Sequence, residues 1–186
     1  QAQADITPGQ EATWTLMALS AYLPHDATWR SRDGEEWSIA RVVEMEAATD
    51  IYASACGGAH RLYGLIAALK QHVAATGRSR AELEGAWAMA AEVIDDAINR
   101  ARRFQQADGS FSTHSFERPG TSADVFARLG ATGHVFEVVV MALDDERLTE
   151  PWVTRAADRL VTLLEQTADV DVECGALYHA AHGLLL

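Results

Sequence analysis

Apolar residues recur every three or four positions along most of the chain, which is the spacing of amphipathic helices. With glycine and proline as boundary signals, the pattern predicts main helices over about 8–23, 35–53, 59–76, 79–104 and 133–143, a short one over 122–129, and two more starting at 151 and near 175. The longest irregular stretch, 105–121, contains three Ser and two Gly and the turn-forming sequence Asp-Gly-Ser. No alternating run is long enough to predict a strand, so we expect an all-α fold.

Single residues mark several of these helix boundaries. Pro24 stops the first helix, and Pro151 suits the first position of a later one. Ser79 and Glu82 have the spacing of a capping box, which predicts that the helix over 79–104 starts there. In the second helix the helical period turns Trp37 toward the core.

A glycine-rich segment containing a histidine recurs along the chain. An offset of 74 residues places His60 over His134, and an offset of 119 places His179 over His60. The matched segments lie in alternate predicted helices, which leaves the intervening helices as their partners. We therefore expect repeated antiparallel helical hairpins that form a partial or small α/α toroid.

In a toroid of this kind the apolar alternate helices lie inside and run parallel, so their N-termini meet at one mouth. The residues expected there are polar or aromatic: His60, His134, Glu137, Cys174, Tyr178, His179 and His182. Such a mouth is the default place for a ligand. Two interpretations of the repeated histidines are open, since a histidine near a helix start can also serve as a structural cap.

The segment Gln105–Phe111 resembles the Q-x-x-D-G-S-W/F repeat of the terpenoid cyclases and protein prenyltransferases, a superfamily of α/α toroids that also has squalene-oxidase-type repeats. The resemblance implies that this repeat ties outer to inner helices, and that Phe111 is buried. Segments such as 54–58 and 175–179 are also similar to uncharacterised bacterial proteins, mostly from planctomycetes.

The segment Tyr178-His179, followed by Gly183-Leu184, resembles the Y-H-x-x-x-x-G-L segment of prenyltransferase β subunits, where the histidine is a zinc ligand. Only His179 carries over, because the D-x-C element of that family corresponds to 108–110 here, with serine in place of cysteine. The acidic D-x-D-D motif of the cyclases is absent, and its nearest counterpart is 169–172.

From these patterns we assign candidate roles. Glu137 lies on an otherwise apolar helix, where loss of water favours the protonated acid, and we predict that it acts catalytically with His179. Glu173 is a further acid that can complement this pair. The predicted substrate-binding residues are His60, His134, Tyr178 and His182. No cofactor is assigned; zinc is a possible metal, with His134, Cys174 and His179 as its candidate ligands.

Charge and composition narrow the class of protein. Asp and Glu outnumber Lys and Arg by 27 to 15, giving a net charge of −12, so we expect no nucleic-acid partner. The apolar run 135–143, interrupted by Glu137, falls short of the roughly 20 residues that span a bilayer, so no transmembrane segment is expected. Two cysteines leave both a cytoplasmic location and an extracytoplasmic one after signal cleavage open.

The length suits one domain over 1–186. Because the chain starts without Met and stops inside an apolar helical pattern at 184–186, we expect it to be a fragment of a longer one.

Three functions fit the sequence. The first is a toroid-like domain that binds an apolar or isoprenoid-like small molecule at the mouth, with or without catalysis. The second is a non-catalytic interaction or scaffold subunit that assembles through the open flank of an incomplete ring. The third, weaker one is a carbohydrate-active α/α barrel, for which five tryptophans supply candidate platforms: Trp14, Trp29, Trp37, Trp87 and Trp152.

Overall fold

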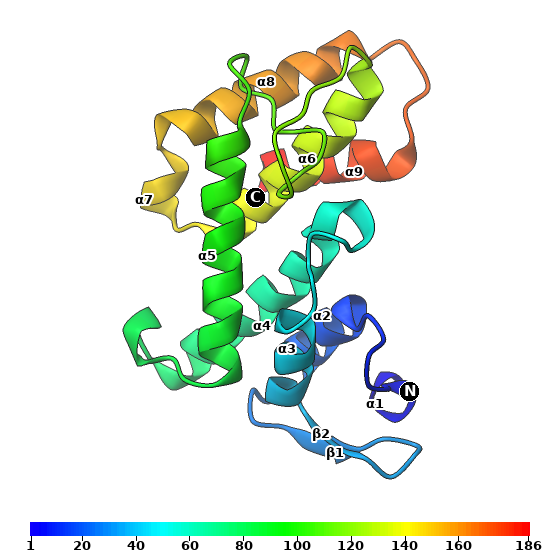
Figure 1. Cartoon of the computed structure of the whole chain (residues 1–186), viewed down its shortest axis with the longest axis vertical. Coiled ribbons are helices and arrows are strands. Elements are labelled where there is room, and N and C mark those ends of the chain that lie inside the picture. Colours follow the sequence, from blue (N-terminus) through cyan, green and yellow to red (C-terminus); the bar gives the residue numbers. More distant parts are fainter. The chain divides into compact units, whose positions relative to one another are not determined.

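The computed structural model describes residues 1–186 and confirms an all-α fold, with nine α-helices, two 3₁₀ turns and one two-stranded sheet (Figure 1). The chain divides into two compact units. Unit 1 comprises Gln1–Ser54 and His60–Asp95, and unit 2 comprises Ala55–Ala59 and Asp96–Leu186. Each unit is described by itself below.

Unit 1 contains three main helices, a hairpin and the first half of a fourth helix. Its elements are α1 (Ala2–Asp5), α2 (Thr13–Tyr22), β1 (Thr28–Arg30), β2 (Glu36–Ser38), α3 (Ile39–Ala47), α4 (Ala59–Thr76), the 3₁₀ turn η2 (Arg80–Glu82) and the start of α5 (Ala86–Phe104). α2 and α3 pack together, and the buried apolar core includes Leu16, Ile39, Val42, Leu62, Leu65 and Ile66.

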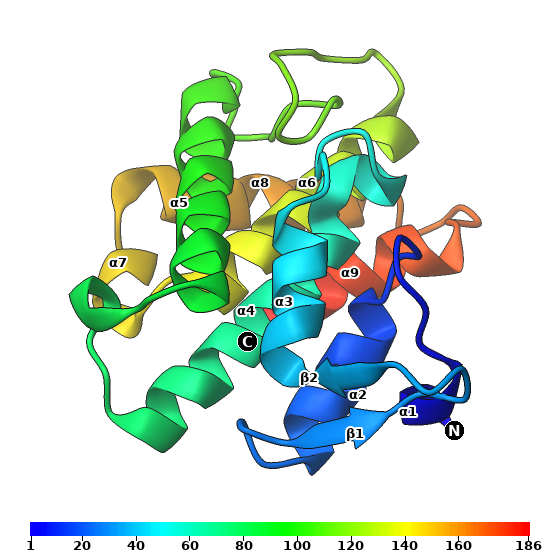
Figure 2. The ribbon, with the colours of Figure 1, turned by 60° about the horizontal axis from the view of Figure 1, so that its bottom comes forward.

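The hairpin of unit 1 corrects the expectation that the chain has no strand (Figure 2). β1 and β2 are antiparallel, with Trp29 opposite Trp37. Each strand has only three residues, too few for an alternating pattern to stand out. Because β2 continues to Ser38, the helix expected from 35 begins at Ile39, and it ends at Ala47 rather than 53. Trp37 is buried as expected, but from a strand.

Two boundaries show how well local signals predict helix ends. α4 occupies 59–76 as predicted. The capping box of Ser79 and Glu82 is present, but it caps the short turn η2 instead of the long helix. Gly85 then adopts a φ of 56°, a left-handed conformation that interrupts the helix, so α5 starts at Ala86.

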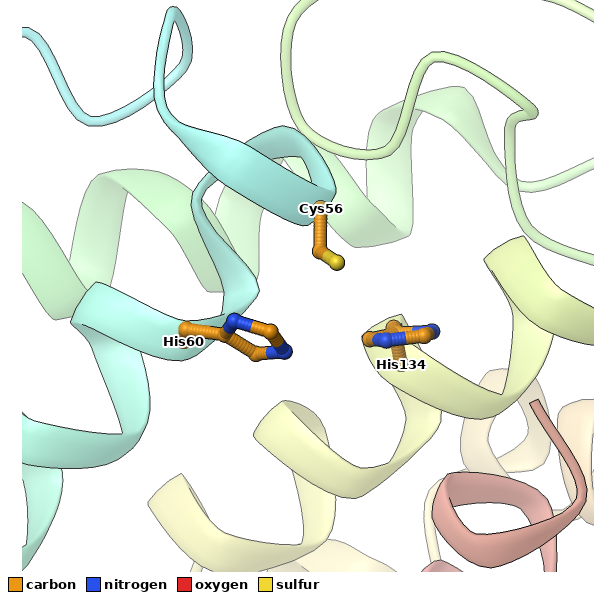
Figure 3. A group of neighbouring side chains, drawn as sticks. All are labelled: Cys56, His60 and His134. Atoms are coloured by element: carbon orange, nitrogen blue, oxygen red, sulfur yellow. The ribbon is translucent and has the colours of Figure 1, made fainter. Parts of the chain in front are cut away.

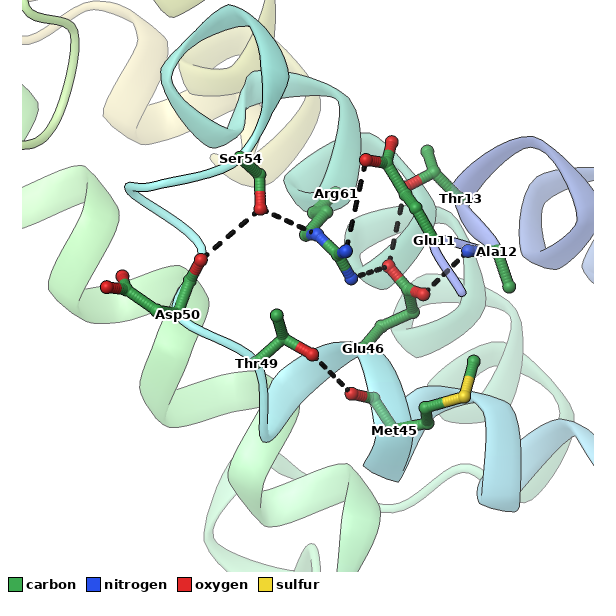
Figure 4. A network of polar contacts seen from close by, with 9 residues as sticks. All are labelled: Glu11, Ala12, Thr13, Met45, Glu46, Thr49, Asp50, Ser54 and Arg61. Atoms are coloured by element: carbon green, nitrogen blue, oxygen red, sulfur yellow. Dashed lines mark hydrogen bonds and ion pairs between the residues drawn. The ribbon is translucent and has the colours of Figure 1, made fainter. Parts of the chain in front are cut away.

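A buried ion pair holds three segments of unit 1 together (Figure 4). Glu46 is fully buried; its Oε1 accepts a hydrogen bond of 2.7 Å from the backbone N–H of Ala12, and its Oε2 lies 2.7 Å from Nη1 of Arg61. Arg61 also donates through Nε to Ser54 Oγ at 2.8 Å. Burial raises the pKa of the Glu46 carboxyl, although the hydrogen bond from Ala12 and the charge of Arg61 oppose that rise. The donors around Glu46 satisfy both of its oxygens.

Unit 2 is built around one long apolar helix. Its elements are the 3₁₀ turn η1 (Ala55–Gly58), the second half of α5, α6 (Val125–Ala142), α7 (Asp145–Leu148), α8 (Pro151–Gln166) and α9 (Cys174–Leu185). α6 packs against both α8 and α9, and both views show the three side by side (Figures 1 and 2). α6 is long and apolar enough to cross a membrane by length and composition, but a buried core helix passes the same test, and half of the apolar window is buried. The structure therefore shows no clear transmembrane segment.

Glycines let α6 and α9 approach closely. A Cβ atom added at Gly133 would lie 2.9 Å from the backbone nitrogen of Ala180, and one at Gly183 would lie 3.3 Å from the Glu137 backbone. The sequence pattern predicted a break between helices at 129–133, whereas α6 is continuous there. The glycine at 133 serves helix packing, and this close packing brings Glu137 next to α9.

The segment Gln105–Phe111 connects the helices of unit 2. Gln105 donates to the Trp152 carbonyl at 2.8 Å and accepts from Arg155 at 2.8 Å, so it links the end of α5 to α8. Gly109 has a φ of 92°, and a Cβ atom there would lie 2.5 Å from the Arg155 carbonyl oxygen. Phe111 is buried, as predicted. In this chain the segment is a structural tie.

Asp108 adds charge to that tie. Its carboxylate accepts from the Ser110 backbone and hydroxyl, and it pairs with Arg128 of α6 and, at 3.2 Å, with Arg159 of α8. Burial raises the pKa of Asp108, but the hydrogen bonds from Ser110 and the two guanidinium charges together lower it below its usual value. The carboxylate therefore stays ionised and links α6 to α8.

Candidate functional site

A buried carboxylate between two imidazoles is the main polar feature of unit 2. Glu137 of α6 is 3% exposed. Its Oε2 lies 2.5 Å from Nδ1 of His179, and its Oε1 contacts Nδ1 of His182. The two histidines are three positions apart on α9, so they share one helix face and reach the same carboxylate.

The contacts with Glu137 assign the two nitrogens of each ring. With Glu137 ionised, its carboxylate only accepts hydrogen bonds, and each Nδ1 then carries the proton of its contact with Glu137. Nε2 is then the nitrogen of each ring that can accept another proton or bind a ligand. The side chain of His179 is 9% exposed and that of His182 is 38% exposed. One ring is therefore enclosed, and the other reaches the surface.

His134 and Tyr178 extend this cluster. The ring of His134 lies 3.9 Å from that of His179, centroid to centroid, and its Nδ1 is 2.7 Å from the Gly130 carbonyl oxygen. That carbonyl can only accept, so Nδ1 of His134 carries the proton of this contact. Tyr178 stacks on His182 at 5.4 Å and is exposed. His134 and Tyr178 thus each stack on one of the two histidines that contact Glu137.

Glu173 places a second carboxylate near the rings. It caps α9 by accepting bonds of 2.7 Å from the backbone N–H groups of Gly175 and Ala176. These bonds lower the pKa of Glu173, and the charges of His134 and His179 lower it further. This carboxylate therefore stays ionised beside the rings.

The remaining predicted residues lie elsewhere. Cys174 is the first residue of α9 and is exposed. His60 belongs to unit 1, where its ring contacts Trp14 at 5.1 Å and Tyr63 at 5.9 Å between centroids. Of the residues predicted for the mouth, unit 2 thus brings together His134, Glu137, Tyr178, His179 and His182.

Cys56 is a neighbour of this cluster that the sequence did not predict. It belongs to unit 2, and its Sγ atom lies within 4.8 Å of a ring nitrogen of His134; both residues are drawn with His60 in Figure 3. The two residues are 78 positions apart, and Cys56 lies outside the predicted helices. The Cys-Gly-Gly sequence indicated only a turn.

Comparison of the chain with protein-family models, curated proteins and solved structures found no match.

Proposed function

We propose that unit 2 binds an apolar or isoprenoid-like small molecule and catalyses proton transfer on it through His179 and His182. The observation that carries this proposal is the buried Glu137 carboxylate, which accepts from Nδ1 of both rings. A carboxylate in this position fixes the orientation of the imidazoles, as the orienting acid does in catalytic triads.

The charge of the group formed by Glu137, His179 and His182 supports a role in acid–base catalysis. One carboxylate and two neutral imidazoles carry a charge of −1, and a single added proton neutralises the group. With one proton for two rings, one imidazole is an acid and the other is a base, which is the pairing that a proton shuttle needs.

Exposed apolar surface beside the rings supports the choice of ligand. Tyr178 is 56% exposed and stacks on His182, and the neighbouring Leu177 is 45% exposed. An apolar chain lying on this surface would place a polar group of the ligand near Nε2 of His182. Glu137 is enclosed, so it acts by holding the rings and not by contacting the ligand.

The proposal is tested with geranylacetone, an isoprenoid ketone whose protons next to the carbonyl exchange with D₂O when a base removes them. NMR follows the loss of these proton signals. We expect the chain to accelerate exchange and the His179→Ala, His182→Ala double variant to lose about 100-fold of that acceleration, which is typical of a general base. His25→Ala, which removes a histidine of unit 1, is the matched control. Equal exchange rates in the double variant and the control would reject the proposal.

A second candidate function is non-catalytic association with another protein chain. Leu177 and Leu185, which lie on the same face of α9, are 45% and 84% exposed. Sedimentation of the wild type and of a Leu177→Lys, Leu185→Lys variant tests the simplest form of this function, self-association. A concentration-dependent dimer that the variant loses would support it, and a monomer at all concentrations would exclude that form.

A further inference from the structure

A cavity of about 410 Å³ in unit 1 is lined by the β1–β2 hairpin and by the start of α3 (Figure 2). Its volume falls in the range of about 300–1,000 Å³ that is usual for small-molecule sites. β2 ends at Ser38, whose Oγ caps α3 by accepting a hydrogen bond of 3.0 Å from the backbone N–H of Arg41. This cap holds Arg41 beside the strands. Two other lining side chains, Arg30 and Glu36, are largely exposed, so the cavity is open to solvent.

Two tryptophans form the aromatic part of this cavity. Trp29 of β1 is directly opposite Trp37 of β2. Trp37 is buried, and the guanidinium carbon of Arg41 lies 4.2 Å from the centroid of its ring, which packs that ring in place. Trp29 is half-buried, so part of its indole is available to a ligand. The indole N–H groups of both tryptophans have no hydrogen-bond partner. The walls therefore combine an aromatic surface with polar donors that lack an acceptor.

The charges around the cavity balance each other. Arg30 pairs with Glu36 at 2.5 Å, and Arg41 pairs with Glu35 at 2.8 Å. An anion would have to compete with these two carboxylates and approach a chain of net charge −12. An apolar ligand would cover charged groups and take them out of water. A neutral ligand with several hydroxyl groups meets neither obstacle, because each hydroxyl both donates and accepts hydrogen bonds.

We propose that this cavity binds a neutral sugar. The C–H groups on one face of a pyranose ring are apolar and pack on the indole of Trp29, while the hydroxyls at the edge of the ring need donors and acceptors. The guanidinium groups of Arg30 and Arg41 donate to sugar oxygens, and Glu36 accepts from a sugar hydroxyl. Glu36 is the one carboxylate that lines the cavity, whereas hydrolysis of a glycosidic bond uses two. The site therefore binds the sugar without cleaving it.

This inference goes beyond the proposed function, because it concerns unit 1, another class of ligand and none of the residues around Glu137. It is tested by nitrogen-15 NMR of the five indole N–H signals during titration with methyl β-glucoside, methyl β-galactoside and cellobiose. Trp29→Phe and Trp37→Phe assign the two cavity signals. We expect at least one of these sugars to shift both cavity signals in a saturable way and to leave the signals of Trp87 and Trp152 in place. No saturable shift with any of the three would overturn the proposal.

The role of Trp29 as the packing surface is tested by its removal. Trp29→Ala should weaken sugar binding about tenfold or more, a loss typical of truncating an aromatic anchor. The shift of the Trp37 signal reports this loss. Tyr22→Ala is the matched control, because it removes an exposed aromatic ring of unit 1 that does not line the cavity, and it should leave the affinity unchanged. Equal affinities in the two variants would contradict the assignment of the site.

Glu36→Gln distinguishes a sugar from an anion, and because Glu36 is exposed, the variant is informative even if Trp29→Ala folds poorly. Loss of the charge should weaken sugar binding about fivefold, since a charge-assisted hydrogen bond becomes a neutral one. Glu44→Gln, an exposed change on α3, is the control and should have no effect. An anion would instead bind more tightly once the competing carboxylate is neutral. Inorganic phosphate or geranylacetone that shifts the cavity signals while the three sugars do not would overturn the proposal.

Discussion

Each unit of this chain buries one glutamate, and the partners of the two glutamates differ in kind. Glu46 in unit 1 pairs with Arg61, a side chain that does not lose its proton, and with the backbone N–H of Ala12. Glu137 in unit 2 pairs with two imidazoles, the side-chain type that most often serves as a general acid or base. The first carboxylate can only hold structure together, whereas the second holds groups that can carry out chemistry.

The comparison also shows why burial alone does not identify a functional acid. Both carboxylates are nearly inaccessible to solvent. What differs is whether the partner of each carboxylate has a second atom that can take part in proton transfer. Arg61 uses its guanidinium on Glu46 and Ser54, while each histidine beside Glu137 uses one nitrogen for the carboxylate and has a second nitrogen at Nε2.

The largest expected effect comes from breaking the ion pair of Glu46 and Arg61. Glu46→Ala leaves the buried charge of Arg61 without its carboxylate, and we expect unfolding of unit 1 to become easier by about 3–5 kcal/mol. Glu137→Ala removes two hydrogen bonds but leaves imidazoles that can be neutral, so the expected loss is about 1–3 kcal/mol. Urea unfolding measures both, with the exposed Glu44→Ala as control. A larger loss at Glu137 than at Glu46 would contradict the comparison.

The next effect concerns the structural tie of unit 2. Gly109→Ala forces a Cβ atom against the Arg155 carbonyl at a positive φ, and we expect a loss of about 1–3 kcal/mol. Gly130→Ala is the matched control, because a Cβ there meets only Ala176 at 3.7 Å within a helix, so it should be neutral or slightly stabilising. Thermal unfolding of the two variants checks the difference, and equal melting temperatures would show that the segment does not hold α8 in place.

A smaller effect distinguishes a structural histidine from those beside Glu137. His72 of unit 1 is buried, stacks on Trp87 at 4.0 Å, and has no hydrogen-bond partner on either ring nitrogen. His72→Phe keeps the stacking and removes two unsatisfied polar atoms, so we expect stabilisation by about 1–2 kcal/mol.

The same histidine should give unit 1 a pH dependence. Burial lowers the pKa of His72, and the charges of His25 and Arg78 lower it further. With a folded pKa below the usual 6.5, the stability linked to His72 is complete above that value and is lost as pH falls through the folded pKa. Denaturation at pH 7 and pH 5 should show this loss in the wild type and less of it in His72→Phe. Parallel pH profiles would exclude this role.

The smallest effect sharpens the assignment of Glu173 as a helix cap. Its backbone hydrogen bonds hold its pKa below the usual 4.5, so the cap contributes above that value and is lost as pH falls through the lowered pKa. Glu173→Gln should therefore flatten the acid side of the stability profile of unit 2. The helical circular dichroism signal between pH 6 and pH 3 measures this change. If the signal falls with pH in the same way in the wild type and in Glu173→Gln, the charge of Glu173 does not stabilise the helix.

Local signals predicted much of this fold. The bounds of α4, the burial of Phe111 and the start of α9 follow from glycine boundaries and helical periodicity. The hairpin at Trp29 and Trp37 was missed because three residues per strand carry too little pattern. The break predicted near Gly133 was wrong because glycine also permits close helix packing, which only the tertiary structure reveals.

The site was predicted in part for similar reasons. A glutamate in an apolar helix and two histidines on one helix face are visible in the sequence, and so Glu137, His179 and His182 were named. Their contact joins residues 42 and 45 positions apart, which no local pattern encodes. The nearness of Cys56 to His134 depends on how a turn packs in three dimensions, which no local sequence pattern encodes. The toroid, the zinc site and the family resemblance stay predictions.

Glu137 is inferred to hold both imidazole rings through Nδ1, so that Nε2 is the nitrogen that can exchange a proton with a ligand. Nitrogen-15 NMR of the imidazole side chains, at a pH where the rings are neutral, measures it directly, because protonated and unprotonated ring nitrogens resonate far apart. We expect His179 and His182 to be protonated at Nδ1 and unprotonated at Nε2. We also expect Glu137→Gln to disturb this arrangement in both rings. Rings protonated at Nε2 in the wild type, or rings indifferent to Glu137→Gln, would contradict it.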